Sequence, residues 1–190
     1  WLINFSNPSG ILTEALLNYT NVKMVGLCNV PINTIDGIKR RMNLPDAYIE
    51  YIGLNHFAYV TKILDNGVDY LQQALSEGVT GAAMKNIPTS GFTKEQIAAI
   101  GAIPTSYLEY YYFKDSKLDH LKHAEKSRGE RCMEIEEELL AIYQNAELHV
   151  KPAQLSQRGG ARYSEVAINL VNSIWNDVGD IQVVNVLNKG

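Results

Sequence analysis

The chain has 190 residues, of which 46% are apolar, so it can bury the core of one domain or a large part of a two-domain enzyme. Its 17 basic and 21 acidic residues are interspersed and leave a formal charge of −4, which gives no reason to expect nucleic acid or an anionic membrane as a partner. No apolar run approaches the roughly 18 residues of a membrane-spanning helix. Two cysteines far apart in the sequence indicate a reducing, cytoplasmic setting without a disulfide framework.

The order of apolar and turn residues predicts a mixture of strands and helices. We expect strands at residues 1–6, 22–27, 48–54, 57–64 and 181–187. We expect helices at about 11–19, 34–42, 68–76, 93–100 and 163–175, and a long charged helix that ends near 143 with a break near Gly129. Thr93 and Gln96 have capping-box spacing, residues 77–91 are the candidate mobile loop, and residues 158–162 form a turn or loop.

Cys28 and His56 are candidate partners in one site, because each follows a predicted strand and each lies next to an asparagine. Taken alone, Cys28 is more often a small buried apolar residue. Taken together, Cys28 and His56 are as consistent with a metal site as with two side chains that only pack in the core. Their spacing matches no structural zinc pattern, and two protein ligands leave coordination positions open, as a catalytic metal requires.

Tyr107 stands out from the run of tyrosines at 107 and 110–112, most of which are expected to pack as an amphipathic surface. It follows Pro104 at a predicted helix start, where a phenol can face a cleft. A phenol is a poor base at its ordinary pKa of about 10, but a nearby cation lowers that pKa. Arg128 and Arg131 could supply such a charge or bind an anion, or they could lie on a solvated helix face.

Several stretches, in order along nearly the whole chain, resemble glycoside hydrolase family 4, the NAD- and divalent-metal-dependent phosphoglycosidases. Within that family the chain is most similar to the enzymes that act on 6-phospho-β-glucosides. The stretches are NFSNPSG at 4–10, VGLCNVP at 25–31, GLNH at 53–56, PTSYLEYYY at 104–112, RGG at 158–160 with Tyr163 and Ser164, and residues 184–190.

The resemblance implies an α+β fold, namely a lactate/malate-dehydrogenase-like C-terminal domain with the last strand or strands of a Rossmann-type domain. Residues 1–30 would end the dinucleotide-binding domain, and residues 31–190 would form an α+β catalytic or substrate domain. No glycine-rich turn follows a strand in this chain. We therefore expect a piece of a longer protein, truncated at both ends and inactive by itself.

The resemblance also implies roles for single residues. Cys28 and His56 would be ligands of Mn²⁺ or another divalent metal, and Tyr107 would be the catalytic base. Asn7 would contact the sugar or the adjoining NAD, and Arg128 would bind substrate near the metal. Asn29 and Asn55 would also bind substrate. Asn29 stands where α-specific members tend to carry an aspartate after the cysteine, which favours a β-linked substrate.

The implied reaction is hydrolysis by redox, elimination and addition: hydride leaves C3 of the sugar, a proton leaves C2, and the aglycone is eliminated. This explains why no pair of carboxylates has glycosidase spacing. The expected partners are a phosphorylated disaccharide or β-glucoside and further copies of the chain in a homo-oligomer, with no nucleic acid and no membrane. Alternatives are an α-glycosidase or α-galacturonidase of the same family, an NAD-dependent 2-hydroxy-acid dehydrogenase, and a structural or oligomerisation domain.

Overall fold

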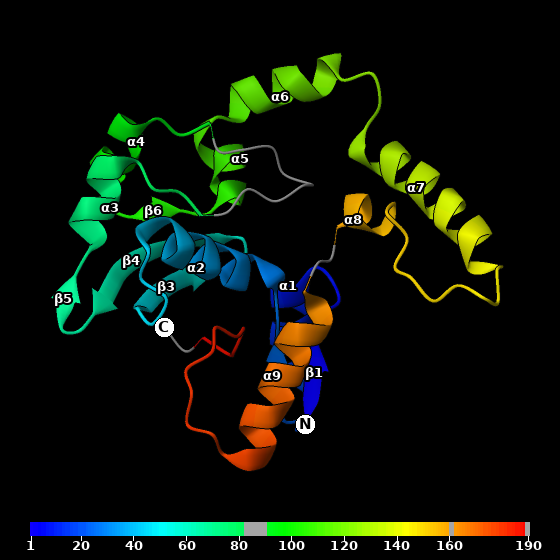
Figure 1. The fold of residues 1–190 in the computed structure, drawn as a ribbon, viewed down its shortest axis with the longest axis horizontal. Coiled ribbons are helices and arrows are strands. Elements are labelled where there is room, and N and C mark those ends of the chain that lie inside the picture. The colour runs from blue at the N-terminus through cyan, green and yellow to red at the C-terminus, as the bar shows by residue number, and fades with distance from the viewer. Residues whose placement is uncertain (82–90, 160–161, 189–190) are drawn as a thin grey trace.

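The computed structural model describes residues 1–81, 91–159 and 162–188 (Figure 1). The first 42 residues form a β-α-β-α unit, and an antiparallel sheet with helices on it follows. The strands are β1 (Leu2–Asn4), β2 (Met24–Gly26), β3 (Tyr48–Leu54), β4 (Phe57–Asp65), β5 (Val68–Asp69) and β6 (Ile103–Pro104). The helices are α1 (Ser9–Tyr19), α2 (Asn29–Met42), α3 (Leu71–Glu77), α4 (Lys94–Ile100), α5 (Glu109–Tyr112), α6 (Lys114–His123), α7 (Arg128–Tyr143), α8 (Leu155–Arg158) and α9 (Tyr163–Asn176), with the 3₁₀ helix η1 (Ser106–Leu108).

The β1-α1-β2 unit places α1 directly against β2. The two strands are parallel, and Asn4 pairs with Gly26. Ser9 in the first turn of α1 donates a hydrogen bond from Oγ to the carbonyl of Leu27, at 3.0 Å. A methyl group at Gly26 would collide with Thr13 Oγ1, so the close approach of helix and strand depends on this glycine. Cys28 lies two residues after the end of β2.

The antiparallel sheet has the order β3-β4-β5, and β6 also pairs with β4. The side chains of Val60 and Ile63 from β4 are fully buried against Ile38 of α2 and Leu108 of η1. This core fixes α2 across the sheet and holds the β3-β4 turn near the start of α2 (Figure 1).

A second, smaller core joins the C-terminal helix to the first unit. Val166 and Leu170 of α9 pack against Val25 and Leu27. Helices α6 and α7 extend to one side of the molecule beyond the sheet, with α8 beside α7 (Figure 1). The start of α9 and the end of α8 are thereby brought toward the residues that follow β2.

The α+β class is confirmed, and the predicted helix 34–42 is wrong at its start. The helix begins at Asn29, with Cys28 as N-cap. Pro31 lies in the first helical turn, where its missing N–H has no intrahelical acceptor to lose.

Residues 68–76 begin as the short strand β5, because Val68 pairs with Asp65 before α3 starts, and this start was not predicted. The long charged helix is broken at residues 124–127, just before Gly129, since Ser127 forms a capping box with Glu130 and starts α7. The predicted strand 181–187 makes one bridge, between Asn185 and Gly26.

The capping box of Thr93 with Gln96 is confirmed. Most of the predicted mobile loop, residues 82–90, lies outside the described residues, as do residues 160–161 of the predicted turn.

Candidate active site

Cys28 and His56 are brought together, with Cys28 Sγ 3.5 Å from His56 Nε2. Cys28 is held by its place at the start of α2, where the thiol accepts a hydrogen bond from the backbone N–H of Val30. His56 lies in the two-residue turn between β3 and β4 with a φ of 68°, a left-handed conformation that is uncommon for histidine. The buried Thr105 supports this turn by donating a hydrogen bond from Oγ1 to the carbonyl of His56, at 3.2 Å.

Tyr107 completes the group, because its ring stacks on the ring of His56 with centroids 4.0 Å apart and an angle of 10°. The stacking fixes the plane of the phenol beside the thiol and imidazole. A small pocket of about 140 Å³ opens at this point. It is lined by Phe5, Asn7, Leu27, Cys28, Asn29, His56, Tyr107, Arg158, Gly159 and Tyr163.

Burial shifts the protonation of all three groups toward their neutral forms. It raises the pKa of Cys28, and the backbone hydrogen bonds from Val30 and Asn29 oppose that shift only partly. It lowers the pKa of His56. It also raises the pKa of Tyr107, and a negative charge on Cys28 would raise that pKa further. A cation placed between Cys28 and His56 would favour the thiolate, the neutral imidazole and the phenolate together.

The donor atoms fit such a cation. A thiolate and an imidazole nitrogen both bind divalent transition metals, and the two side chains lie close enough to hold one ion together. The observed separation of Sγ and Nε2 is 3.5 Å, which also suits an S–H···N contact when no ion is bound. Among the described residues no group of three or more His, Cys, Asp or Glu side chains could hold a metal. Water or substrate oxygens would be suitable further ligands of a catalytic metal held by these two side chains.

The three predicted asparagines lie around Cys28. Asn7 and the buried Asn29 line the small pocket. Asn55 lines a neighbouring pocket of about 250 Å³, which Cys28 also borders. Their assignment to substrate stays a prediction, and their positions are compatible with it.

Arg128 does not line the small pocket. Its guanidinium donates hydrogen bonds from Nη2 to the carbonyls of Gln157 and Arg158, at 2.9 and 3.0 Å. The arginine that lines the pocket is Arg158, which sequence reasoning did not single out as a site residue although it quoted the RGG stretch.

Phe5 and Tyr163 were also missed. Their rings stack with centroids 4.6 Å apart, and both line the pocket. Tyr163 is the first residue of α9, and its pKa is raised by burial and by the charge of Cys28. The available signal was the Tyr-Ser pair that follows RGG, but nothing in a linear sequence indicates that it returns to the first strand.

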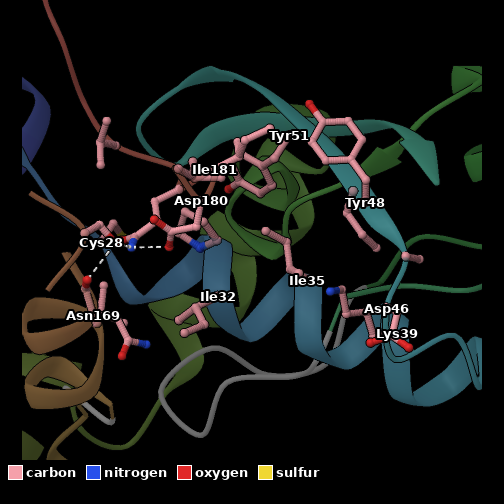
Figure 2. A pocket seen from close by; sticks show the side chains of 18 of the residues that line it. Cys28, Ile32, Ile35, Lys39, Asp46, Tyr48, Tyr51, Asn169, Asp180 and Ile181 are labelled. Atoms are coloured by element: carbon pink, nitrogen blue, oxygen red, sulfur yellow. Dashed lines mark hydrogen bonds between the residues drawn. The ribbon is translucent and has the colours of Figure 1, made fainter. Parts of the chain in front are cut away.

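A larger pocket of about 710 Å³ lies on the other side of Cys28. Figure 2 shows Ile32, Ile35 and Lys39 along α2, with Tyr48 and Tyr51 on β3 above them. This pocket has Cys28 at its edge but does not contain His56, Tyr107 or Asn7. His56 and Tyr107 thus line the smaller pocket, and Cys28 borders both pockets.

Fold and pocket together define an α+β domain that presents a thiol, an imidazole and a phenol at one site. Two family models match the chain: the family 4 glycosyl hydrolase model over residues 1–44 and the family 4 glycosyl hydrolase C-terminal domain over residues 51–190. The chain belongs to the family 4 glycosyl hydrolases.

Curated relatives of similar sequence agree with this family membership. The chain is 39% identical to a Bacillus subtilis strain 168 protein named probable 6-phospho-β-glucosidase and 35% identical to the 6-phospho-β-glucosidase of Escherichia coli K12. Each match covers 100% of the chain and 45% of the relative, so the chain spans somewhat under half the length of these proteins.

A solved structure has the same fold. The 6-phospho-β-glucosidase from Thermotoga maritima, determined with manganese, NAD⁺ and glucose 6-phosphate, is 33% identical with a TM-score of 0.82. That match covers 99% of the chain and 44% of the solved one. Among the described residues, no helix is both long and apolar enough to cross a membrane.

Proposed function

We propose that the chain is part of an enzyme that hydrolyses 6-phospho-β-glucosides with NAD⁺ and a divalent metal. The observation that carries the proposal is the meeting of Cys28, His56 and Tyr107 around one pocket, on three separate segments of a family 4 chain. The relatives described above support the substrate class, because 6-phospho-β-glucosidases match the whole chain at 33–39% identity.

Cys28 and His56 would hold the metal, for which Mn²⁺ is the candidate. When bound, NAD⁺ would accept and later return the hydride at C3 of the sugar, and the metal would polarise the oxygen at that carbon. A thiolate is softer than the ligands that manganese prefers, and substrate and water oxygens would complete a mixed coordination shell. The backbone N–H groups at the start of α2 offset part of the effect of burial on the pKa of Cys28, and a bound cation would favour the thiolate.

Tyr107 would be the base that removes the proton from C2. Its ring is held in plane by His56, so the phenol oxygen has a fixed approach to a sugar bound in the pocket. Transfer of the C2 proton to the phenolate oxygen would leave an electron pair that forms the C1–C2 double bond as the C1–oxygen bond to the aglycone breaks. Water would then add its hydroxide at C1, its remaining proton would balance the one taken up by the aglycone oxygen, and the phenol would return its proton to C2.

The remaining predicted contacts follow from their places in the site. Asn7 would contact the sugar or the cofactor, and Asn29 and Asn55 would contact the sugar. Asn29 lies beside Cys28 and replaces the acidic residue of α-specific members, which favours the β-anomer. We also propose that the protein is a cytoplasmic homo-oligomer. Residues 1–30 would end its dinucleotide-binding domain, and residues 31–190 would form a lactate/malate-dehydrogenase-like C-terminal domain.

A phospho-α-glucosidase is the second candidate, because PagL of Clostridium acetobutylicum is 27% identical over 100% of the chain. A substrate panel separates the two. The full-length enzyme, supplied with NAD⁺ and Mn²⁺, is assayed on 4-nitrophenyl α- and β-glucosides with and without a 6-phosphate. We expect turnover of the phosphorylated β-glucoside, and preferred turnover of the phosphorylated α-glucoside would reject the β assignment.

A further inference from the structure

Thr105 is a buried threonine, 1% exposed, that lies two positions before Tyr107. It follows β6 and is the N-cap residue of η1, the 3₁₀ helix that carries Tyr107. An N-cap threonine usually turns its hydroxyl toward the backbone N–H groups of its own helix. Within residues 105–108, all of which the structure describes, the Thr105 side chain makes no such capping bond. Its hydroxyl is used by another segment of the chain instead.

That segment is the two-residue turn between β3 and β4, of which His56 is the second residue. Oγ1 of Thr105 donates to the carbonyl of His56 at 3.2 Å, across 49 positions of sequence. His56 has a φ of 68°, a backbone conformation that a residue other than glycine keeps only where surrounding contacts hold it. Because the hydrogen bond ends on the carbonyl of His56 itself, it supports the backbone from which the imidazole projects.

The backbone of Thr105 joins the same hairpin to η1. Its N–H donates to the carbonyl of Ala58 in β4 at 3.1 Å, and its carbonyl accepts from the N–H of Leu108 in η1 at 3.0 Å. The side chain of Leu108 is fully buried in the main core, which anchors η1. The N–H, the carbonyl and the hydroxyl of Thr105 thus connect the hairpin that presents His56 with the helix that presents Tyr107.

The stack of His56 on Tyr107, with ring centroids 4.0 Å apart, requires these two segments to keep one relative position. We propose that Thr105 is a positioning residue of the candidate active site, whose hydroxyl holds His56 in the orientation in which the imidazole both stacks on Tyr107 and meets the thiol of Cys28. Thr105 is not among the described residues that line the small pocket, so it acts through His56. The inference rests on the proposed function for the metal and the reaction, but not for the geometry of the stack.

The first test follows the geometry by NMR in the metal-free, full-length protein, labelled with ¹³C at Cε1 of histidine and kept at about pH 8, where the His56 ring is neutral. The ring current of Tyr107 should shift the Cε1 proton of His56 upfield, and Tyr107→Leu, which has no ring, gives the unstacked reference. Thr105→Val loses the hydroxyl and keeps the shape of the side chain, so the signal should move toward that reference. Thr105→Ser keeps the hydroxyl, so the signal should stay near that of the wild type.

The second test measures Mn²⁺ binding to the full-length enzyme by calorimetry, with NAD⁺ binding as the control for folding. Thr105→Val should raise the Kd for Mn²⁺ by about 10-fold, the lower end of the range for a residue behind a metal ligand, because the lost bond holds the backbone of His56 and not its ring. Thr105→Ser should restore Mn²⁺ binding to nearly that of the wild type. The matched control is Thr61→Val, because Thr61 also donates its hydroxyl within the β3-β4 pair, to Glu50 at 2.8 Å, but away from the turn. It should change neither the His56 signal nor the Kd.

A purely structural role would lower the free energy of unfolding of Thr105→Val in urea while leaving the His56 signal and the Kd for Mn²⁺ unchanged, and that result would overturn the proposal. If Thr105→Val does not bind NAD⁺, Thr105→Ala, which removes the hydroxyl without adding an atom, takes its place with the same expectations. Hydrolysis of 6-phospho-β-glucosides with a Thr105-independent signal and Kd would reject the positioning role and leave the proposed function standing. A His56 signal and an Mn²⁺ Kd that depend on the Thr105 hydroxyl, without such hydrolysis, would reject the proposed function and support the positioning role.

Discussion

Replacing Lys117 with methionine should destabilise the protein, because it removes the cation that pairs with a buried carboxylate. Glu109 lies two residues after Tyr107 and its side chain is 0% exposed, while the side chain of Lys117 is 21% exposed. The ammonium of Lys117 contacts Oε2 of Glu109, and Oε1 accepts a hydrogen bond from the backbone N–H of Gly91 at 2.8 Å.

Breaking a buried ion pair from one side costs about 3–5 kcal/mol. We expect the lower end, about 3 kcal/mol, because the ammonium is partly hydrated in the native state. For a chain of this size the loss corresponds to a decrease in Tm of about 6–12 °C. In the double variant Glu109→Gln with Lys117→Met, the amide oxygen can still accept from Gly91 and no charge is left buried, so the loss should fall to about 1 kcal/mol.

Urea unfolding followed by circular dichroism measures these free energies. Lys122→Met, at an exposed position of the same helix, is the control and should stay within about 0.5 kcal/mol of the wild type. A single-variant loss below about 1 kcal/mol, or a double variant as unstable as the single one, would refute the reasoning.

Three further predictions concern the site and its support. Gly26→Ala should lower the free energy of unfolding by about 1–3 kcal/mol, because the methyl group meets Thr13 Oγ1, and an unchanged urea midpoint would contradict the close packing of α1 on β2. Burial lowers the pKa of His56 below its ordinary value of 6.5. The stability contributed by the neutral ring is therefore present above pH 6.5 and is lost as the pH falls through the lower pKa of the folded state. An NMR titration midpoint of His56 at or above 6.5 in the metal-free protein would argue against this. The double variant Cys28→Ser with His56→Ala should lose the activation of the full-length enzyme by Mn²⁺, and calorimetry should detect no Mn²⁺ binding. Retained binding would show that Cys28 and His56 are not the metal ligands.

The meeting of Cys28 and His56 could be predicted from the sequence because each residue follows a strand, and strand ends can converge on one site. Tyr107 could be assigned only through the family resemblance. Its stacking on His56 depends on Thr105 holding the β3-β4 turn, a contact between residues 49 positions apart. Sequence periodicity carries no information about such a contact.

Two details of the predicted elements depend on the partners that the residues find in the fold. Residues 181–187 have the apolar character of a strand, but only Asn185 finds a backbone partner among the described residues, at Gly26. The break in the charged helix was predicted near Gly129 and lies just before it, at residues 124–127. The capping box of Ser127 with Glu130 decides the helix start, and glycine in the first turn is tolerated.

The arginines illustrate the same limit. Arg128 and Arg158 lie 30 residues apart, and both sit on or beside helices with many charges. Which guanidinium lines the pocket is decided by α8 folding back along α7. That packing leaves no trace in local composition.

The central claim is that Tyr107 removes the proton at C2 of the sugar, and exchange with solvent tests it most directly. The full-length enzyme with NAD⁺ and Mn²⁺ is incubated with a 6-phospho-β-glucoside in D₂O, and deuterium at C2 of the product is measured by NMR or mass spectrometry. The wild type should incorporate deuterium, and Tyr107→Phe, which keeps the stacking on His56 but lacks the phenol oxygen, should not. Undiminished incorporation at C2 by Tyr107→Phe would contradict the account.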